Sequence, residues 1–198
     1  PEELAREAKM LQNAGVDMIT IMDSAGTMLP DQAAAYTEAL ADALSIPVAF
    51  HCHNNLGLSA ANALAAWQNG AAILDCGLMG MARSAGNLAT EVCVALMQRH
   101  GEMKDIDLFG MLDFIENRLQ PAMAAHNYHN PISPTDLTLG YSGCHSSFLK
   151  LFKKAAAEKG VNLFRLITEV SAANQKNPSE ELIAQTADRL IKAQKEEA

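Results

Sequence analysis

The chain has 198 residues, of which 49% are hydrophobic and 19% are charged, and its formal net charge at pH 7 is -8. This composition is typical of a globular protein with one sizeable core or two small ones, and it excludes an intrinsically disordered chain. The excess of acidic residues argues against nucleic acid and against an anionic membrane surface as partners. No apolar run in the sequence approaches the length of a membrane-spanning helix.

The four cysteines, at positions 52, 76, 93 and 144, are widely spaced and include no CxxC pair. This spacing predicts reduced thiols in a cytoplasmic protein. Cys76 and Cys93 fall within apolar patterns, so we expect both to be core residues.

Helical and strand patterns alternate over the first hundred residues. Leu4, Ala8 and Leu11 recur at helical spacing and predict a first helix, which Gly15 ends. Runs of β-forming and apolar residues predict three strands, and helical patterns separate them. The expected strands are 16–22, 46–50 and 72–76, and the expected helices are 2–14, 30–44, 59–69 and 88–99. This βα series predicts an α/β fold with a parallel sheet, whose functional loops share one edge.

The strand patterns stop after Gly101. An apolar stripe predicts a helix over 105–125, and a polar, proline-containing linker follows over 126–134. Further helices are expected over 142–159, 163–174 and from 179 onward. We therefore expect an α/β domain over residues 1–125 and a helical domain over residues 126–198.

His51 and His53 follow the second predicted strand, in the sequence HCHNN. Side-chain direction repeats every two residues along a strand, so both imidazoles can point the same way and bind one metal ion. The alternative is one exposed histidine and one hydrogen-bonded core histidine, and an HxH pair alone does not decide between them. The position at the end of a parallel strand, where such sheets bind their ligands, favours the metal site.

Polar residues also follow the other two strands. Ser24 could donate a hydrogen bond to a substrate oxygen or only to the backbone, and Asn87, at the end of the small-residue loop 77–87, could contact a ligand or cap the next helix. His145 stands in a glycine-bracketed stretch at the start of a helix. It could be catalytic only if that segment folds back over the strand ends.

Three strings, MDSAGTMLP, HCHNNLGLSAANALAAWQNGA and LDCGLMGMARSAGNLATEV, together resemble the HMG-CoA lyase-like metal-dependent aldolases and lyases. These are TIM barrels of the DRE-TIM type. The later string TDLTLGYSGCHSSFL, followed by helices, is similar to the 4-hydroxy-2-oxovalerate aldolase branch of that family. The resemblance implies the C-terminal portion of a TIM (β/α)8 barrel, here three parallel βα units, followed by an all-helical communication domain.

The resemblance also assigns expected roles. His51 and His53 match the two metal-binding histidines, which in the family usually hold manganese, with magnesium or cobalt as alternatives, and His51 is expected to lie beside the substrate. Ser24 and Asn87 match residues close to the substrate and the metal. His145 stands where these aldolases usually carry a tyrosine that reaches the active site, so it is expected to be catalytic, with imidazole as the hydrogen-bond donor.

The family's first strand carries Arg-Asp-Gly, and no such segment is present. We therefore expect the chain to be a C-terminal part of the enzyme and to be inactive by itself. The whole enzyme is expected to cleave 4-hydroxy-2-oxovalerate and similar 4-hydroxy-2-oxo acids to pyruvate and an aldehyde.

In the family this aldehyde passes to a bound acylating aldehyde dehydrogenase, and a homo-oligomer is expected as well. Two alternatives remain at this point. One is an acyl-CoA lyase or a Claisen-type synthase of the same superfamily, and the other is an inactive folded fragment.

Overall fold

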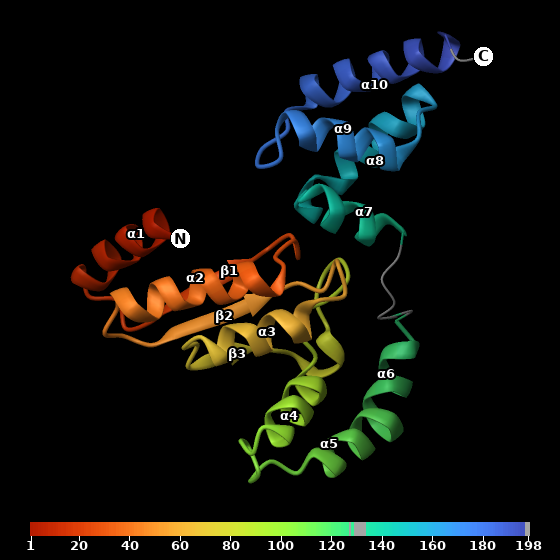
Figure 1. The fold of residues 1–198 in the computed structure, drawn as a ribbon. Coiled ribbons are helices and arrows are strands. Elements are labelled where there is room, and N and C mark those ends of the chain that lie inside the picture. The colour runs from red at the N-terminus through yellow and green to blue at the C-terminus, as the bar shows by residue number, and fades with distance from the viewer. Residues whose placement is uncertain (127, 129–133, 197–198) are drawn as a thin grey trace. The chain divides into compact units, whose positions relative to one another are not determined.

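The computed structural model describes residues 1–126, 128 and 134–196. Its backbone contacts divide the chain into two compact units, Pro1–Pro131 and Ile132–Ala198. Figure 1 shows the first unit in red to green and the second in teal to blue. The first unit alternates helices and strands, and the described part of the second is helical. This order confirms the predicted fold class.

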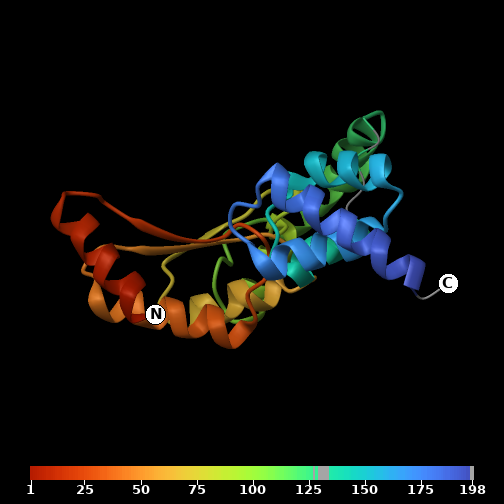
Figure 2. The same ribbon diagram turned by 90° about the horizontal axis from the view of Figure 1, so that it is seen from above.

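The sheet of the first unit has three parallel strands in the order β1-β2-β3. The strands are β1 (Ile19–Asp23), β2 (Val48–Cys52) and β3 (Ile73–Asp75), and the helices around them are α1 (Glu2–Asn13), α2 (Pro30–Ala43), α3 (Ser59–Gln68) and α4 (Thr90–Arg99). Helices α2 and α3 lie on the same face of the sheet (Figures 1 and 2). Met22 pairs with His51, and His51 pairs with Asp75, so these three side chains share the opposite face.

The boundaries of all three strands differ from the prediction by one to three residues, and two of these differences have a structural meaning. β1 begins at Ile19 and not at residue 16, because pairing starts where the Ile19 N–H donates to the Pro47 carbonyl at 3.1 Å. β2 runs on to Cys52 and not only to Phe50. His51 is therefore part of the strand, and the strand's geometry sets its direction.

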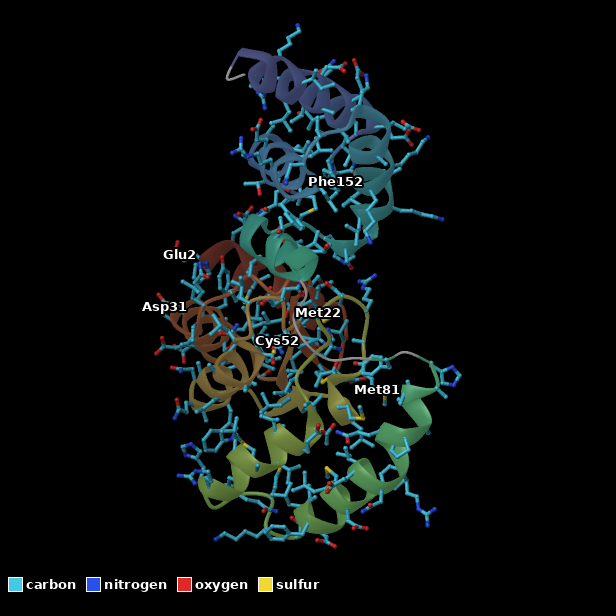
Figure 3. All side chains as sticks on the ribbon, turned by 90° about the vertical axis from the view of Figure 1, so that its right-hand side faces the viewer. Glu2, Met22, Asp31, Cys52, Met81 and Phe152 are labelled. Carbon is cyan, nitrogen blue, oxygen red and sulfur yellow. The ribbon has the colours of Figure 1, made fainter. Side chains whose placement is uncertain are left out.

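The core of the first unit lies between the sheet and its helices. Ile21, Phe50 and Cys52 alternate along their strands and are at most 4% exposed. Ala33 and Ala66, both fully buried on α2 and α3, are small enough for the helices to approach the strands closely. Figure 3 shows Cys52 inside this unit.

The opposite face of the sheet carries exposed apolar side chains. Met22 is 55% exposed and Ile73 is 43% exposed. In a closed βα barrel the corresponding face is packed with side chains.

The helix expected over 105–125 begins later and is not uniform. It consists of α5 (Leu108–Phe114), the π-helical turn η2 (Ile115–Leu119) and α6 (Gln120–Ala124). The helix begins at residue 108 because the Asp107 carboxylate accepts a hydrogen bond from the Gly110 N–H at 2.9 Å and caps it. The π turn ends at Leu119, two residues before Pro121, which has no N–H to continue the regular ladder.

The second unit contains α7 (Pro134–Ser142), the 3-10 turn η3 (Ser146–Phe148), α8 (Leu149–Lys159), α9 (Leu163–Ala173) and α10 (Glu180–Glu196). Most of the expected linker lies outside the described residues. The prediction of a helix starting at residue 142 was wrong, because Gly143 adopts a φ of +67° and ends α7. Phe152, Leu166 and Ile167, all fully buried, form the centre of a separate core. Figure 3 shows Phe152 among these helices.

Candidate functional site

Two histidine rings meet at the carboxyl end of β2. His51 lies within the strand, and His53 follows it and is 7% exposed. Their ring centroids are 5.5 Å apart, with the ring planes at 69°. The His53 N–H donates to the Asp23 carbonyl at 3.2 Å, so β1 fixes the backbone of this pair. The structure thus brings the two predicted ligands together on the face opposite the helices.

Asp75 is a member of the site that the sequence analysis did not single out. Its Oδ2 lies 2.7 Å from Nδ1 of His51. The two residues are register partners in the parallel pair of β2 and β3, so the contact follows from the strand alignment. A carboxylate near the end of a predicted strand was the only signal in the sequence. The sequence does not reveal which residue on β2 lies beside it.

The loop after β3 passes over the histidine pair. The Asn54 N–H donates to the Gly86 carbonyl at 2.8 Å, and Asn87 forms an isolated β-bridge with His53. The Oδ1 atom of Asn87 is buried and accepts no hydrogen bond within the described part of the chain. A buried amide oxygen without a donor is destabilising unless a ligand or ion contacts it. Asn87 thus offers a buried acceptor oxygen on a residue whose backbone is bridged to His53.

The loop after β1 is held by Asp23. This side chain is 4% exposed, and its two oxygens accept hydrogen bonds from the N–H groups of Thr27, at 2.9 Å, and Met28, at 3.1 Å. These contacts make Asp23 a turn-forming residue. Ser24 follows it, half-buried at the same edge of the sheet. Gly26 approaches the next loop so closely that an added Cβ would lie 2.8 Å from the Asn55 nitrogen.

His145 belongs to the second unit, directly before η3. Its Nδ1 accepts a hydrogen bond from the Ser147 N–H at 3.2 Å and lies 2.8 Å from the Ser147 hydroxyl. Because a backbone N–H can only donate, a neutral His145 ring carries its proton on Nε2. The imidazole is therefore a hydrogen-bond donor at Nε2. Its expected role at the strand edge stays a prediction.

Three thiols lie near the strand ends on the helix side of the sheet. Burial, followed by the charges of Asp23 and Asp75, raises the pKa of Cys52 to about 12. A hydrogen bond from Cys93 lowers the pKa of Cys76 to about 6, and the same bond raises the pKa of Cys93. Cys93 is 3% exposed, as expected of a core residue, whereas Cys76 is only half-buried.

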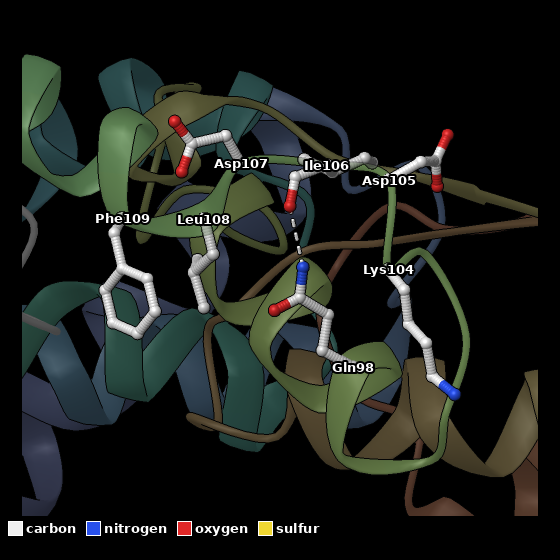
Figure 4. Close-up of a pocket in the computed structure, with 7 residues that line it drawn as sticks. All are labelled: Gln98, Lys104, Asp105, Ile106, Asp107, Leu108 and Phe109. Atoms are coloured by element: carbon white, nitrogen blue, oxygen red, sulfur yellow. Dashed lines mark hydrogen bonds between the residues drawn. The ribbon is translucent and has the colours of Figure 1, made fainter.

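The pocket drawn in Figure 4 lies elsewhere. It has a volume of about 500 Å³ and lies between the end of α4 and the start of α5, where Gln98 Nε2 donates to the Ile106 carbonyl at 2.8 Å. Helix α4 starts at the carboxyl edge of the sheet and runs back about 1.5 Å per residue, which takes Gln98 away from the histidines. This pocket is not part of the candidate site.

In the described ranges 1–126, 128 and 134–196, no three His, Cys, Asp or Glu side chains are grouped so that they could hold a metal ion. The two histidine rings are in contact, and the backbone of Asn87 is bridged to that of His53. No helix of these ranges is long and apolar enough to cross a bilayer.

A parallel βα sheet with polar side chains gathered at its carboxyl edge is the arrangement in which barrel-type enzymes build their active sites. The comparison with known families makes the assignment specific. Residues 1–116 match the HMGL-like family and residues 131–192 match the DmpG-like communication domain. The chain belongs to the HMGL-like family.

Curated relatives carry the name 4-hydroxy-2-oxovalerate aldolase. The protein from Chloroflexus aurantiacus is 43% identical over 171 residues, which are 86% of this chain and 49% of the relative. The protein from Geobacillus genomosp. 3 is 38% identical over 193 residues, which are 98% of this chain and 56% of the relative. The chain thus spans about half the length of the curated relatives it matches.

Solved structures share the fold. The carboxyl transferase domain of Rhizobium etli pyruvate carboxylase, solved with pyruvate and biocytin, gives a TM-score of 0.74 at 19% identity, over 97% of this chain and 34% of that one. The N-terminal domain of a putative aldolase from Bacteroides vulgatus gives a TM-score of 0.59 at 24% identity, over 67% of this chain and 43% of that one. At this level of identity the similarity establishes the fold class alone.

Proposed function

We propose that this chain forms part of an aldolase that cleaves 4-hydroxy-2-oxo acids, such as 4-hydroxy-2-oxovalerate, to pyruvate and an aldehyde. The observation that supports this most directly is the pairing of His51 and His53 on one strand face, with Asn87 beside them. The names of the curated relatives supply the substrate class. As two nitrogen ligands are a weak and open metal site, we expect the 198-residue chain alone to be inactive.

The residues fit a divalent cation. Both ligands are imidazoles, which suit a borderline metal, and the buried Asn87 Oδ1 accepts no hydrogen bond within the described residues. Manganese is the proposed ion, with magnesium and cobalt as alternatives. When bound, the ion would supply Lewis-acid polarisation of the 2-keto group and charge stabilisation of the enolate.

The remaining residues bind and orient the substrate. Ser24 is placed at the strand edge to donate its hydroxyl to a substrate oxygen, and Asn87 contacts the bound group from the opposite loop. The resemblance to the aldolase branch supports a catalytic role for His145, whose Nε2 is the hydrogen-bond donor because its Nδ1 accepts from the Ser147 N–H. Charge-assisted hydrogen bonds of this kind are strong enough to fix the orientation of a carboxylate.

The test is the Mn²⁺ content of the full-length enzyme. His51→Ala and His53→Ala should each lower Mn²⁺ affinity by about a hundredfold or more and abolish pyruvate release. His126→Ala, an exposed histidine outside the site, is the matched control and should keep both. Retention of Mn²⁺ by both site variants would refute the metal site.

The same enzyme assay separates the alternative reaction. An acyl-CoA lyase or Claisen-type synthase would turn over an acyl-CoA substrate and leave 4-hydroxy-2-oxovalerate uncleaved. The aldolase proposal requires that 4-hydroxy-2-oxovalerate is cleaved and that the acyl-CoA substrate is not turned over.

The second unit suggests a protein partner. Residues 131–192 match the DmpG-like communication domain, and we propose that this domain docks an acylating aldehyde dehydrogenase that consumes the aldehyde. Deleting residues 135–198 from the full-length enzyme should abolish co-purification with such a dehydrogenase. Co-purification of the truncated enzyme with the dehydrogenase would rule out docking through this domain.

A further inference from the structure

We infer that Asp75 is a positioning residue that holds His51 in the tautomer and orientation in which Nε2 is the metal-binding atom. The inference rests on the metal site proposed above and adds a residue to it. Its basis is the 2.7 Å contact between Asp75 Oδ2 and His51 Nδ1. Strand register builds this contact into the sheet, because the two residues are paired in β2 and β3.

The contact determines where the proton of a neutral His51 ring must be. An ionised carboxylate only accepts hydrogen bonds, so Nδ1 must carry the N–H that Asp75 receives. A neutral imidazole has a single N–H, which leaves the lone pair on Nε2. The hydrogen bond made by one ring nitrogen thus selects the other for the metal.

The surroundings hold the ring in place. The His51 side chain is 12% exposed, and its ring meets the His53 ring in a T-shaped arrangement at a centroid distance of 5.5 Å. Asp75 anchors the Nδ1 side of the ring, while His53 limits its rotation. His51 is therefore pre-oriented before any ligand arrives, which lowers the entropy cost of binding.

Asp75 is better placed to orient a metal-binding histidine than to bind the metal ion itself. Its Oδ2 is committed to Nδ1 of His51, and the carboxylate is 56% exposed. Among the described residues no three His, Cys, Asp or Glu side chains are arranged to hold one ion, so Asp75 does not complete a three-ligand set with the two histidines. Carboxylate–histidine–metal arrangements of this kind raise the basicity of the ligating nitrogen.

The first test measures the tautomer directly, without metal and without activity. In the metal-free full-length enzyme labelled with ¹⁵N-histidine, long-range ¹⁵N–¹H spectra at pH 8 should show His51 protonated at Nδ1, with the His51→Gln spectrum giving the assignment. In Asp75→Ala the proton should move to Nε2, the position that neutral imidazole favours in water. Asp75→Asn, which keeps an acceptor oxygen, should retain the Nδ1 proton. This closer substitution tests the same contact if Asp75→Ala fails to fold.

Asp42→Ala, which removes an exposed carboxylate on α2, is the matched control and should leave the His51 tautomer unchanged. A wild-type His51 protonated at Nε2, or an Asp75→Ala spectrum identical to wild type, would overturn the inference.

The second test is Mn²⁺ affinity, measured by electron paramagnetic resonance titration. Asp75→Ala should weaken binding by about ten- to a hundredfold, with Asp75→Asn between it and wild type. If Asp75→Ala changes the tautomer but not the affinity, positioning by Asp75 is rejected although the metal site stands. If His51→Ala itself leaves Mn²⁺ binding intact, the proposed function fails, whatever the tautomer shows.

Discussion

At the scale of single residues, the aspartates at the ends of β1 and β3, the two strands that flank β2, have different roles because their oxygens meet different donors. Both oxygens of Asp23 accept backbone N–H groups, so this residue builds the turn after β1. Asp75 instead meets an imidazole. In the sequence both are carboxylates close to the end of a predicted strand; the local turn after β1 sets the partners of Asp23, and the register of β2 with β3 sets the partner of Asp75.

The thiols allow a prediction that depends on pH. Because the hydrogen bond from Cys93 lowers the pKa of Cys76 to about 6, Cys76 is largely thiolate at pH 7, and the thiolate is the nucleophile. Iodoacetamide should therefore label Cys76 before the other three cysteines. The labelling rate should rise with pH and level off once Cys76 is ionised, well below the ordinary thiol range. Peptide mass spectrometry of quenched samples measures this profile.

Cys93→Ala is the matched variant for this experiment. Without the hydrogen bond from Cys93, the labelling of Cys76 should shift to higher pH, toward the behaviour of an ordinary thiol. A profile that is the same in wild type and in Cys93→Ala would show that the thiol pair does not control the reactivity of Cys76.

At the scale of elements, two glycines occupy equivalent positions after helices α1 and α3. Gly15 has a φ of +98° and Gly70 a φ of +103°, each just past the end of its helix. The space around them differs. A Cβ on Gly15 would meet nothing within 4 Å, whereas a Cβ on Gly70 would lie 2.7 Å from the Cβ of Ala41 on α2.

This pair separates backbone strain from steric conflict. Gly15→Ala should lower the free energy of unfolding by about 1–2 kcal/mol, the typical penalty for a side chain at positive φ. Gly70→Ala should lower it by a further 1–3 kcal/mol or so, because α2 and α3 must move apart. Urea unfolding followed by circular dichroism measures both values. Equal losses in the two variants would show that the contact with Ala41 relaxes freely.

The elements of the first unit were largely predictable because local patterns specify them. Leu4, Ala8 and Leu11 predicted α1, and the apolar run that ends at Phe50 predicted β2. What could not be predicted depends on contacts between distant residues. The pairing of His51 with Asp75 is a matter of strand register, and no local pattern encodes it.

The second unit shows the same limit. Gly143 and the capping side chain of His145 break a stretch that is helical by composition alone. Helix α7 was not predicted, because Pro134 marks a helix start as readily as it marks a linker.

At the scale of the whole molecule, the chain has two separate cores. One surrounds Phe50, which is 1% exposed, and the other surrounds Phe152, which is fully buried. Each core belongs to a unit with its own dense set of internal contacts. Domains of this kind usually unfold as separate cooperative units.

We therefore expect core substitutions to act only within their own unit. Phe50→Ala and Phe152→Ala should each lower the stability of the unit concerned by about 3–5 kcal/mol, the usual result of removing a buried aromatic ring. Phe109→Ala is the matched control, since this side chain is 80% exposed, and should change stability by no more than about 0.5 kcal/mol. Hydrogen exchange, measured by mass spectrometry on peptides from each unit, gives the local stabilities. If Phe152→Ala reduced the protection of β1–β3 as much as that of α8 and α9, the two units would instead unfold as one cooperative body.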